Sequence, residues 1–320
     1  MSGPLDLPAS HPPGAGDQMA PDDPAAPAFR AGFIAVVARP NAGKSTLVNG
    51  VVERKVSIVS AKPQTTRHRI TGVLTQPSFQ LVLVDVPGFQ RPLDGLTERM
   101  QATVETTLED VDGALFLVAG DEDVGPGDAF IVRALAERSI PTVAALNKVD
   151  LLTKNRVAEQ LVALAELGDF IAIHPVSALV GDGLGALVND LVDLLPAGPM
   201  FYPDGVVTDR PEEFLVAELV REKVLACTEH EVPHSVAVQV LEFEPREEKR
   251  LTYIRAAIYV ERESQRPIIL GERGRRLKTI GTEARTEIEH LLGTKVFLDL
   301  VVRVRKRWRQ DPSMLGRLGV

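Results

Sequence analysis

The stretch VVARPNAGKST, Val36 to Thr46, decides the fold of the first half of the chain. An apolar run ends here, a short polar loop follows, and a helical pattern begins at Lys44. A strand that feeds such a loop and then a helix directs backbone N–H groups and the positive end of a helix dipole to one point, which favours phosphate. This context predicts a phosphate-binding loop, or P-loop.

The first position of the loop is Ala38, where the usual pattern has glycine. Alanine costs little at negative φ but about 1–2 kcal/mol in the left-handed region. Because Ala38 ends a predicted strand, we expect a negative φ and little effect. Lys44 would bridge the β- and γ-phosphates, and Ser45 would offer its hydroxyl to Mg²⁺. The nucleotide contacts expected from the loop are Asn41, Ala42, Gly43, Lys44, Ser45 and Thr46.

Two further motifs fit a nucleotide site with a metal ion. DVPG, Asp85 to Gly88, follows a predicted strand, so Asp85 would hold Mg²⁺ through water and the Gly88 N–H would sense the γ-phosphate. In the preceding segment KPQTTRHRI, a threonine can complete Mg²⁺ coordination only while the γ-phosphate is present, which makes a switch. We predict Thr66 rather than Thr65; a solvated loop is the alternative. The expected metal ligands are Ser45, Thr66 and Asp85, and the expected catalytic groups are Lys44, Thr66, Asp85 and Gly88.

Two later motifs select the base. NKVD, Asn147 to Asp150, closes another predicted strand. The Asp150 carboxylate can accept hydrogen bonds from guanine N1–H and the exocyclic amine, and adenine offers no such pair. In VSAL, the Ala178 N–H is placed to touch the guanine carbonyl. The sequence therefore predicts a GTP-binding protein with base-site residues Asn147, Lys148, Asp150, Ser177, Ala178 and Leu179.

The residue after Gly88 is Phe89, where many signalling GTPases carry a glutamine that orients the attacking water. Phenylalanine cannot orient water, and we expect the neighbouring Gln90 to point away. Slow turnover, accelerated by a partner or an ion, is therefore expected. Asn41 is the candidate for binding a monovalent cation such as K⁺ in place of an arginine finger; a hydrogen bond within the loop is its alternative role.

The spacing of apolar residues predicts two domains. Up to Leu195, short Val/Ile/Leu runs alternate with amphipathic stretches, which is typical of an α/β domain with a doubly wound, mostly parallel sheet. The expected strands are 33–38, 70–76, 80–85, 113–119, 141–146 and 170–174, and the expected helices are 44–52, 98–110, 127–138, 155–166 and 184–195.

Beyond a Pro- and Gly-rich break the order changes to that of a smaller α+β domain. We expect helices at 211–227 and 274–291 and strands at 234–243, 251–261 and 295–305. The chain is thus divided into a disordered tail (1–30), a nucleotide-binding domain (31–195), a linker (196–210) and a second domain with a C-terminal tail (211–320).

Composition and charge limit the function. The chain is 44% hydrophobic and 25% charged, as in globular proteins, and no apolar run approaches a membrane span. Its single cysteine excludes intramolecular disulfides and suits a reducing cytoplasm. Residues 1–245 carry 18 Lys/Arg against 34 Asp/Glu, whereas residues 246–320 carry 18 against 10. The basic last quarter favours a polyanionic partner, with an ordinary solvated surface as the alternative.

The basic quarter contains GERG, Gly271 to Gly274, followed by a helical pattern. Two glycines around two polar residues let a nucleic-acid backbone approach closely, next to a helix N-terminus. GxxG alone is a weak signal, but arginines and a lysine cluster on it here, while the carboxylate of Glu272 opposes phosphate. We predict binding of single-stranded RNA by Gly271, Arg273, Gly274, Arg275 and Lys278.

The stretch VRVRKRWRQDP alternates apolar and basic residues, which predicts that Arg303, Arg305 and Arg307 share one strand face. Its Trp308 has two possible roles that the sequence leaves open, stacking on a base or filling a core or cap.

The chain resembles the Era family of bacterial GTPases over nearly all of residues 31–319. The segments that carry the resemblance are RPNAGKST, QTTRHRI, DVPGF, NKVD, VSAL, VAELVREK, ERESQ, GERG, IGTEAR and DPSMLGRLG. The resemblance implies a GTPase domain joined to a type II KH domain, binding to the 3′ end of 16S ribosomal RNA, a role in small-subunit maturation, and partial peripheral membrane association. GTPases of this branch commonly lack the catalytic glutamine. Ala38 and Glu272 depart from the family pattern.

We therefore predict a slow, Mg²⁺-dependent GTPase, cycling between GTP and GDP, that binds 16S ribosomal RNA and assists assembly of the small ribosomal subunit. We expect a cytoplasmic monomer, partly peripheral at the inner face of the cell membrane. The alternative is a signalling GTPase whose basic domain binds anionic lipid, but GxxG favours RNA because lipid binding requires only charge. A GTPase acting in RNA modification would need a catalytic domain for which the sequence offers no residues.

Overall fold

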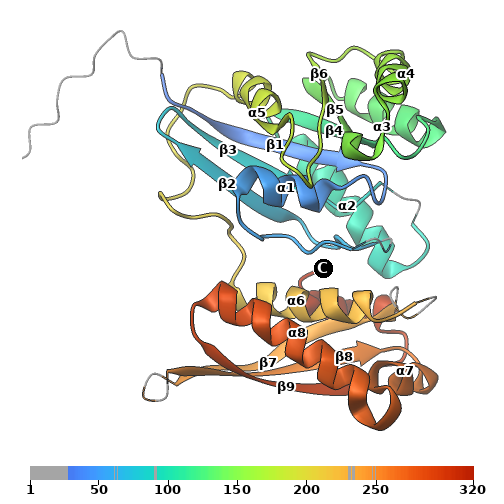
Figure 1. Cartoon of the computed structure of the whole chain (residues 1–320), viewed down its shortest axis with the longest axis vertical. Coiled ribbons are helices and arrows are strands. Elements are labelled where there is room, and N and C mark those ends of the chain that lie inside the picture. The colour runs from blue at the N-terminus through green and yellow to red at the C-terminus, as the bar shows by residue number, and fades with distance from the viewer. Residues whose placement is uncertain are drawn as a thin grey trace, which may run out of the picture.

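The computed structural model describes residues 28–60, 62, 64–89, 92–229, 232, 235–246, 248 and 250–320. They form an α/β domain and a smaller α+β domain, one above the other in Figure 1, joined along one side by a single connecting segment. The predicted N-terminal tail, apart from its last three residues, lies outside the described part of the chain.

The first domain contains one six-stranded sheet in the order β2-β3-β1-β4-β5-β6. Only β2 is antiparallel to its neighbour, so the mostly parallel sheet that the sequence predicts is confirmed. The strands are β1 (Arg30–Ala38), β2 (Ile70–Gln76), β3 (Phe79–Asp85), β4 (Gly113–Ala119), β5 (Thr142–Asn147) and β6 (Ile173–Pro175). The last is shorter and later than expected, although the Ile171 N–H already donates to Thr142 O.

Helices cover both faces of this sheet, as the continuous apolar strands require. On one face lie α1 (Lys44–Val52) and α5 (Leu184–Asp193), and on the other lie α2 (Gly95–Glu109), α3 (Pro126–Ala136) and α4 (Lys154–Ala165). Helix α2 begins three residues earlier than predicted because the Asp94 side chain accepts a hydrogen bond from the Thr97 N–H and caps it. The carboxyl ends of β1, β3, β4 and β5 consequently meet at one edge, where ligands bind in such sheets.

The second domain has a three-stranded sheet in the order β7-β8-β9. Strands β7 (Ala237–Arg246) and β8 (Leu251–Val260) are antiparallel, and β9 (Lys295–Val304) is parallel to β8. A parallel pair needs a crossover, which α7 (Arg266–Leu270) and α8 (Arg275–Leu292) supply. Helices α6 (Glu212–Ala226) and α8 pack on the sheet and on each other around an apolar core.

A further, small apolar cluster lies between the domains. It joins Leu96 and Met100 of α2 to Trp308 and to α9 (Pro312–Leu318), which follows β9. The C-terminal end of the chain accordingly lies between the two domains in Figure 1. Helices α7 and α9 were not predicted, because five and seven residues are too few to show a helical period.

The predicted linker follows the edge of the first sheet before it reaches α6. The Ala31 N–H donates to Pro196 O, and the Val73 N–H donates to Val207 O. No helix in the described residues is long and apolar enough to cross a bilayer.

Candidate nucleotide site and RNA-binding surface

The phosphate loop lies between β1 and α1, as its sequence predicts. Ala38 is a fully buried residue at the end of β1 and is not among the residues with positive φ, so alanine causes no left-handed strain there. The left-handed positions are instead Asn41 (φ 65°) and Gly43 (φ 93°). Lys44 and Ser45 follow as the first, buried residues of α1.

A cavity of about 440 Å³ opens over this loop, a volume in the usual range for small-molecule sites. Its walls come from the loop, the start of α1, the segment before β2, and the ends of β3, β4 and β5. The predicted site residues that line it are Asn41, Gly43, Lys44, Ser45, Thr46, Thr66, Gly88 and Lys148.

Gly43 lies too close to Asn147 for any side chain. A β-carbon at Gly43 would be 2.3 Å from Asn147 Nδ2, and its positive φ also favours glycine. Asn147 Nδ2 donates to Ala42 O, and Asn147 Oδ1 accepts from the Ala178 N–H, each at 2.9 Å. One buried amide thus ties the phosphate loop to the predicted base site, and it occupies the Ala178 N–H that we expected to face guanine.

Asp150 lies just past β5, in a short 3-10 turn, and is exposed. Ser177 Oγ donates to Asp150 Oδ1 at 2.6 Å and so fixes the carboxylate. Lys148 has a positive φ of 65°, and its Nζ lies 3.0 Å from a carboxylate oxygen of Asp121. Sequence reasoning missed Asp121, because the acidic run Asp121-Glu122-Asp123 after β4 belongs to no nucleotide-binding motif. Leu179 is 79% exposed beyond the site.

Three predicted metal-site residues converge on one buried point. Ser45 Oγ donates to Asp85 Oδ2 at 2.8 Å and lies 3.1 Å from Thr66 Oγ1, which is 3.4 Å from the same carboxylate oxygen. Ser57 Oγ also donates to Asp85 Oδ2, at 3.0 Å. Ser57 was not predicted, because it lies 28 residues before Asp85 in a stretch without a motif.

This set of oxygen atoms fits Mg²⁺. Asp85 is fully buried, and its Oδ1 has no hydrogen-bond partner among the described residues. Mg²⁺ is commonly bound through one carboxylate together with hydroxyls, waters and substrate phosphates. The described residues contain no group of three or more His, Cys, Asp or Glu side chains that could hold a metal, so this one-carboxylate site differs from an all-protein metal cage.

Lys44 and Asp85 are buried opposite charges within the site. Burial lowers the pKa of the Lys44 amine, and the charge of Asp85 opposes that shift. Burial likewise raises the pKa of Asp85, against Lys44 and the hydroxyls of Ser45, Ser57 and Thr66. A bound triphosphate would bring negative charge next to Lys44, and a divalent cation would bring positive charge next to Asp85.

The side chain after the DVPG motif is turned away from the cavity. Phe89 packs on the core beneath α2 and α3, with its ring 6.2 Å from that of Phe130. Gly88 remains at the cavity and approaches Pro40 of the phosphate loop. Gln90, the other residue considered for orienting water, lies outside the described residues.

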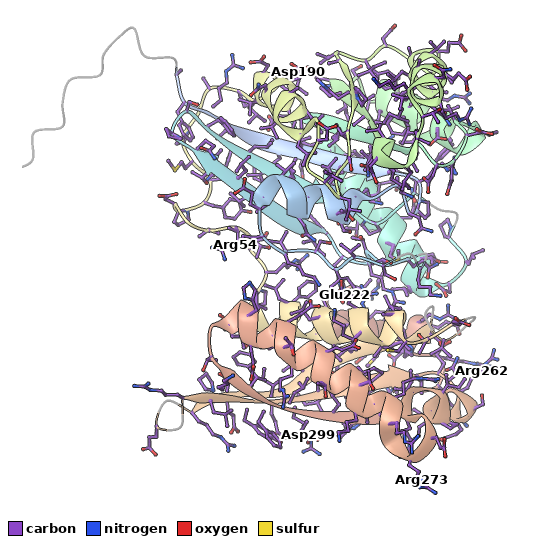
Figure 2. All side chains as sticks on the ribbon, in the orientation of Figure 1. Arg54, Asp190, Glu222, Arg262, Arg273 and Asp299 are labelled. Atoms are coloured by element: carbon purple, nitrogen blue, oxygen red, sulfur yellow. The ribbon has the colours of Figure 1, made fainter. Side chains whose placement is uncertain are left out.

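The GERG turn joins α7 to α8 at the far side of the second domain. Gly271, Arg273 and Gly274 all have positive φ, and a β-carbon at Gly271 would be 2.7 Å from the Cβ of Arg276. Arg276 donates to Ile268 O and closes the turn. Figure 2 shows Arg273 at the edge of the molecule, pointing away from the first domain.

The cationic side chains of this turn are exposed. Within the part of the chain that the structure describes, Arg273, Arg275 and Lys278 form no ion pair, and neither does Glu272, which is exposed beside them. The predicted RNA-binding residues therefore lie together on one accessible turn and the first helical turn after it, available for a polyanion.

The structure decides one question in the C-terminal stretch and corrects one prediction. Of the two roles left open for Trp308, it has the core role: the side chain is 1% exposed, and its Nε1 donates to Ser235 O at 2.9 Å. Arg305 and Arg307 do not share a strand face with Arg303, because β9 ends at Val304. Arg305 instead pairs with Asp311 at 2.8 Å at the start of α9.

Two family models match separate parts of the chain. Residues 33–148 match the family model of the 50S ribosome-binding GTPase, and residues 231–309 match that of the KH domain. Together with the phosphate loop beneath the cavity and the exposed GERG turn, these matches define a GTPase with an attached type II KH domain.

The relatives are more specific. GTPase Era from Mycobacterium avium is 49% identical over 295 residues, which cover 91% of this chain and 99% of the relative. GTPase Era from Mycobacterium tuberculosis is 48% identical over 296 residues, with the same coverage. The chain belongs to the Era family of GTPases, as its motifs indicate.

Solved structures of the family share the whole fold. Era in complex with MgGDPNP and nucleotides 1506–1542 of 16S ribosomal RNA has a TM-score of 0.88 and 36% identity to this chain. A variant of Aquifex aeolicus Era bound to GDP and AlF₄⁻ has the same TM-score and identity. Both comparisons cover 91% of this chain and 99% of the other.

Proposed function

We propose that this GTPase binds 16S ribosomal RNA near its 3′ end through the KH domain and assists assembly of the small ribosomal subunit under the control of its nucleotide. The observation that carries the proposal is the position of residues 64–69, the switch segment. Thr66 of this segment faces the candidate metal site, while its neighbours in sequence are held by the KH domain.

The contacts of the switch segment alternate between the two domains. Arg67 Nη1 donates to Val236 O at 2.6 Å, and the Arg67 guanidinium lies 5.8 Å from the centre of the Trp308 ring. His68 Nδ1 lies 3.2 Å from Gly319 O, and its ring meets Phe214 edge-on. Ordering of Thr66 by GTP therefore acts on residues that already contact the RNA-binding domain.

The residues of the site have distinct roles in this proposal. Mg²⁺ would neutralise charge on the β- and γ-phosphates when bound. Ser45 and Thr66 would offer their hydroxyls to the metal, and Asp85 would hold a metal-bound water. Lys44 would neutralise the phosphates, and the Gly88 N–H would sense the last one. Because Phe89 cannot orient water, the intrinsic rate would be slow.

Asp150 would select guanine, with its carboxylate already oriented by Ser177. Asn147 would hold the phosphate loop and the base site together, and Lys148 lines the cavity. Gly271, Arg273, Gly274, Arg275 and Lys278 would bind the RNA backbone. These assignments extend to this chain the RNA binding seen for the related Era protein.

Asn41 supports a further proposal about the ions. Its left-handed backbone places it on the wall of the cavity, beside the phosphate-binding backbone. A K⁺ ion held there would supply the positive charge that an arginine finger provides elsewhere. Turnover should then fall when K⁺ is replaced by Na⁺, and Asn41→Ala should remove the difference. Equal rates of the wild type in the two salts would end this idea.

The proposed setting is a monomer in the cytoplasm, in contact with the small ribosomal subunit and in part with the inner face of the membrane. A membrane-surface signalling GTPase is the rival, with the basic turn facing anionic lipid. Binding of a 16S 3′-end oligonucleotide and of phosphatidylserine vesicles should be compared at one salt concentration. Weaker RNA binding by Arg273→Ala/Arg275→Ala supports the proposal; vesicle binding without RNA binding contradicts it.

A further inference from the structure

The KH-domain helix α6 carries ionised side chains at the boundary between the domains. Figure 2 shows Glu222 on the side of this helix that faces the first domain. Arg221 directly precedes it and Glu218 lies one turn earlier; these two residues are 2% and 6% exposed. Burying such charges costs free energy unless their partners are well placed. The contacts of this pair therefore point to its role.

Arg221 is held in one geometry by its neighbour. Its Nε donates to Glu218 Oε1 at 2.7 Å, and its Nη2 donates to Glu218 Oε2 at 2.6 Å, a two-point contact that fixes the plane of the guanidinium. The same Nη2 also donates to Thr65 O in the switch segment. Arg221 therefore reaches from the KH domain into the GTPase domain.

The carbonyl that Arg221 holds belongs to the peptide unit that continues into Thr66. Because a peptide bond is planar, fixing Thr65 O also fixes the Thr66 nitrogen and Cα. The Thr66 hydroxyl is 3.1 Å from Ser45 Oγ and 3.4 Å from Asp85 Oδ2, at the candidate Mg²⁺ site. One planar unit thus separates the guanidinium from the hydroxyl.

Helix α6 also binds the chain a few residues before the switch segment. Glu222 Oε1 accepts from the Val59 N–H at 3.0 Å, so consecutive residues of α6 bind the chain at Val59 and at Thr65. The other face of α6 packs on α8, the helix that starts at the GERG turn. The helix that braces the switch segment therefore also supports the candidate RNA surface.

We propose that Arg221, oriented by Glu218, is a positioning residue for GTP hydrolysis that the KH domain contributes to the GTPase domain. It holds the Thr65–Thr66 peptide so that Thr66 is presented to Mg²⁺. This inference rests on the proposed role of Thr66 as a metal ligand. It assigns to the RNA-binding domain a direct effect on metal binding, independent of whether RNA is present.

The test is the Mg²⁺ dependence of GTP hydrolysis by the full chain without RNA. Arg221→Gln alone leaves the Glu218 carboxylate buried without its partner, which can prevent folding. The main variant is therefore Glu218→Met/Arg221→Met, which replaces the pair by apolar side chains of similar length. Its fold is checked by thermal unfolding. Lys55→Gln is the matched control, because Lys55 forms an interdomain pair with Glu222 but does not touch residues 64–69.

We expect the double methionine variant to need about tenfold more Mg²⁺ for half-maximal rate, as for loss of one hydrogen bond from a charged donor, and to approach the wild-type kcat at saturating Mg²⁺. Lys55→Gln should keep the wild-type requirement. A folded double variant with a lower kcat and an unchanged Mg²⁺ requirement would mean that the pair only supports the fold, and would overturn the inference.

Thr66→Ala separates this inference from the proposed function. If Thr66→Ala also raises the Mg²⁺ requirement while the double variant does not, Thr66 is the ligand and only the role of Arg221 is lost. If Thr66→Ala leaves the requirement unchanged, the proposed metal site itself is wrong, and the inference about Arg221 falls with it.

Discussion

The nucleotide site and the GERG turn are both proposed to hold phosphate, yet they are built in opposite ways. In the first, Lys44 and Asp85 are buried and each hydroxyl already has a partner. In the second, Arg273 and Arg275 are exposed and make no ion pair among the described residues. In a buried site whose side chains are bound to one another, each substitution should strongly reduce affinity for the one ligand that fits. An exposed cationic turn can bind any phosphate chain, and each substitution there should reduce affinity only slightly.

The largest effect should follow from changing the base selector. Asp150→Asn replaces two charge-assisted acceptors by one acceptor and a donor that opposes guanine, and GTP affinity should fall about 1000-fold. Affinity for xanthosine triphosphate should rise at the same time. Titration calorimetry with both nucleotides measures the exchange. Ser177→Ala, which removes only the orienting hydroxyl, should cost about tenfold or less; an Asp150 variant with unchanged preference would remove Asp150 as the selector.

A large effect is also expected at the tightest contact of the phosphate loop. Gly43→Ala places a β-carbon 2.3 Å from Asn147 Nδ2 at a left-handed position, so GTP affinity should fall about 100-fold through strain of about 1–2 kcal/mol and displacement of the amide. The matched control is Gly185→Ala in α5, where a β-carbon meets nothing within 4 Å. Equal affinities of the two variants would show that the loop can relax around alanine.

The interface between the two regions should respond to pH. Burial is the main cause that lowers the pKa of His68 from 6.5 to about 4; the charge of Arg221 adds to this shift and Glu218 opposes it. The unfolded chain therefore binds more protons between these values. The contribution of neutral His68 is fully present above pH 6.5 and is lost as the pH falls towards 4, by about 3 kcal/mol.

Denaturant unfolding of the wild type and of His68→Gln between pH 7 and pH 4 measures this contribution. Glutamine does not titrate in this range, so the variant should lose less stability on acidification than the wild type. Parallel curves for the two proteins would show that His68 does not remain neutral at the interface.

The smallest effects should come from the exposed turn. Arg273→Ala and Arg275→Ala should each weaken binding of a 16S 3′-end oligonucleotide severalfold, and each should reduce the slope of log affinity against log salt by about 1. Lys154→Ala, at an exposed cation on α4 of the other domain, is the control and should change neither. An unchanged salt slope in both arginine variants would show that these side chains do not contact phosphate.

The fold and the motif residues could be predicted because each depends on a few adjacent residues. Lys44 and Ser45 are fixed by a strand, a loop and a helix that adjoin in sequence, and the apolar runs fix the sheet. Ser57 could not be found this way, since its role arises only when β3 brings Asp85 beside it. Arg221 meets Thr65 across 156 residues, a distance that no local pattern spans.

Trp308 also shows where a local sequence pattern fails to predict structure. The alternation of VRVRKRWRQDP is real, but β9 ends before the tryptophan, and a helix of only seven residues then covers the indole. The alternation therefore predicted too long a strand. After a strand ends, packing between the domains decides which way a side chain points. Here Trp308 packs against α2.

The nucleotide in the buried site is proposed to control how tightly the exposed turn binds RNA. Calorimetric titration of a 16S 3′-end oligonucleotide into the protein loaded with a non-hydrolysable GTP analogue, and into the protein loaded with GDP, tests this most directly. We predict tighter binding to the GTP-analogue form, by about 5- to 150-fold, the usual range of coupling between two sites. The same affinity in both nucleotide states would contradict communication between the two sites.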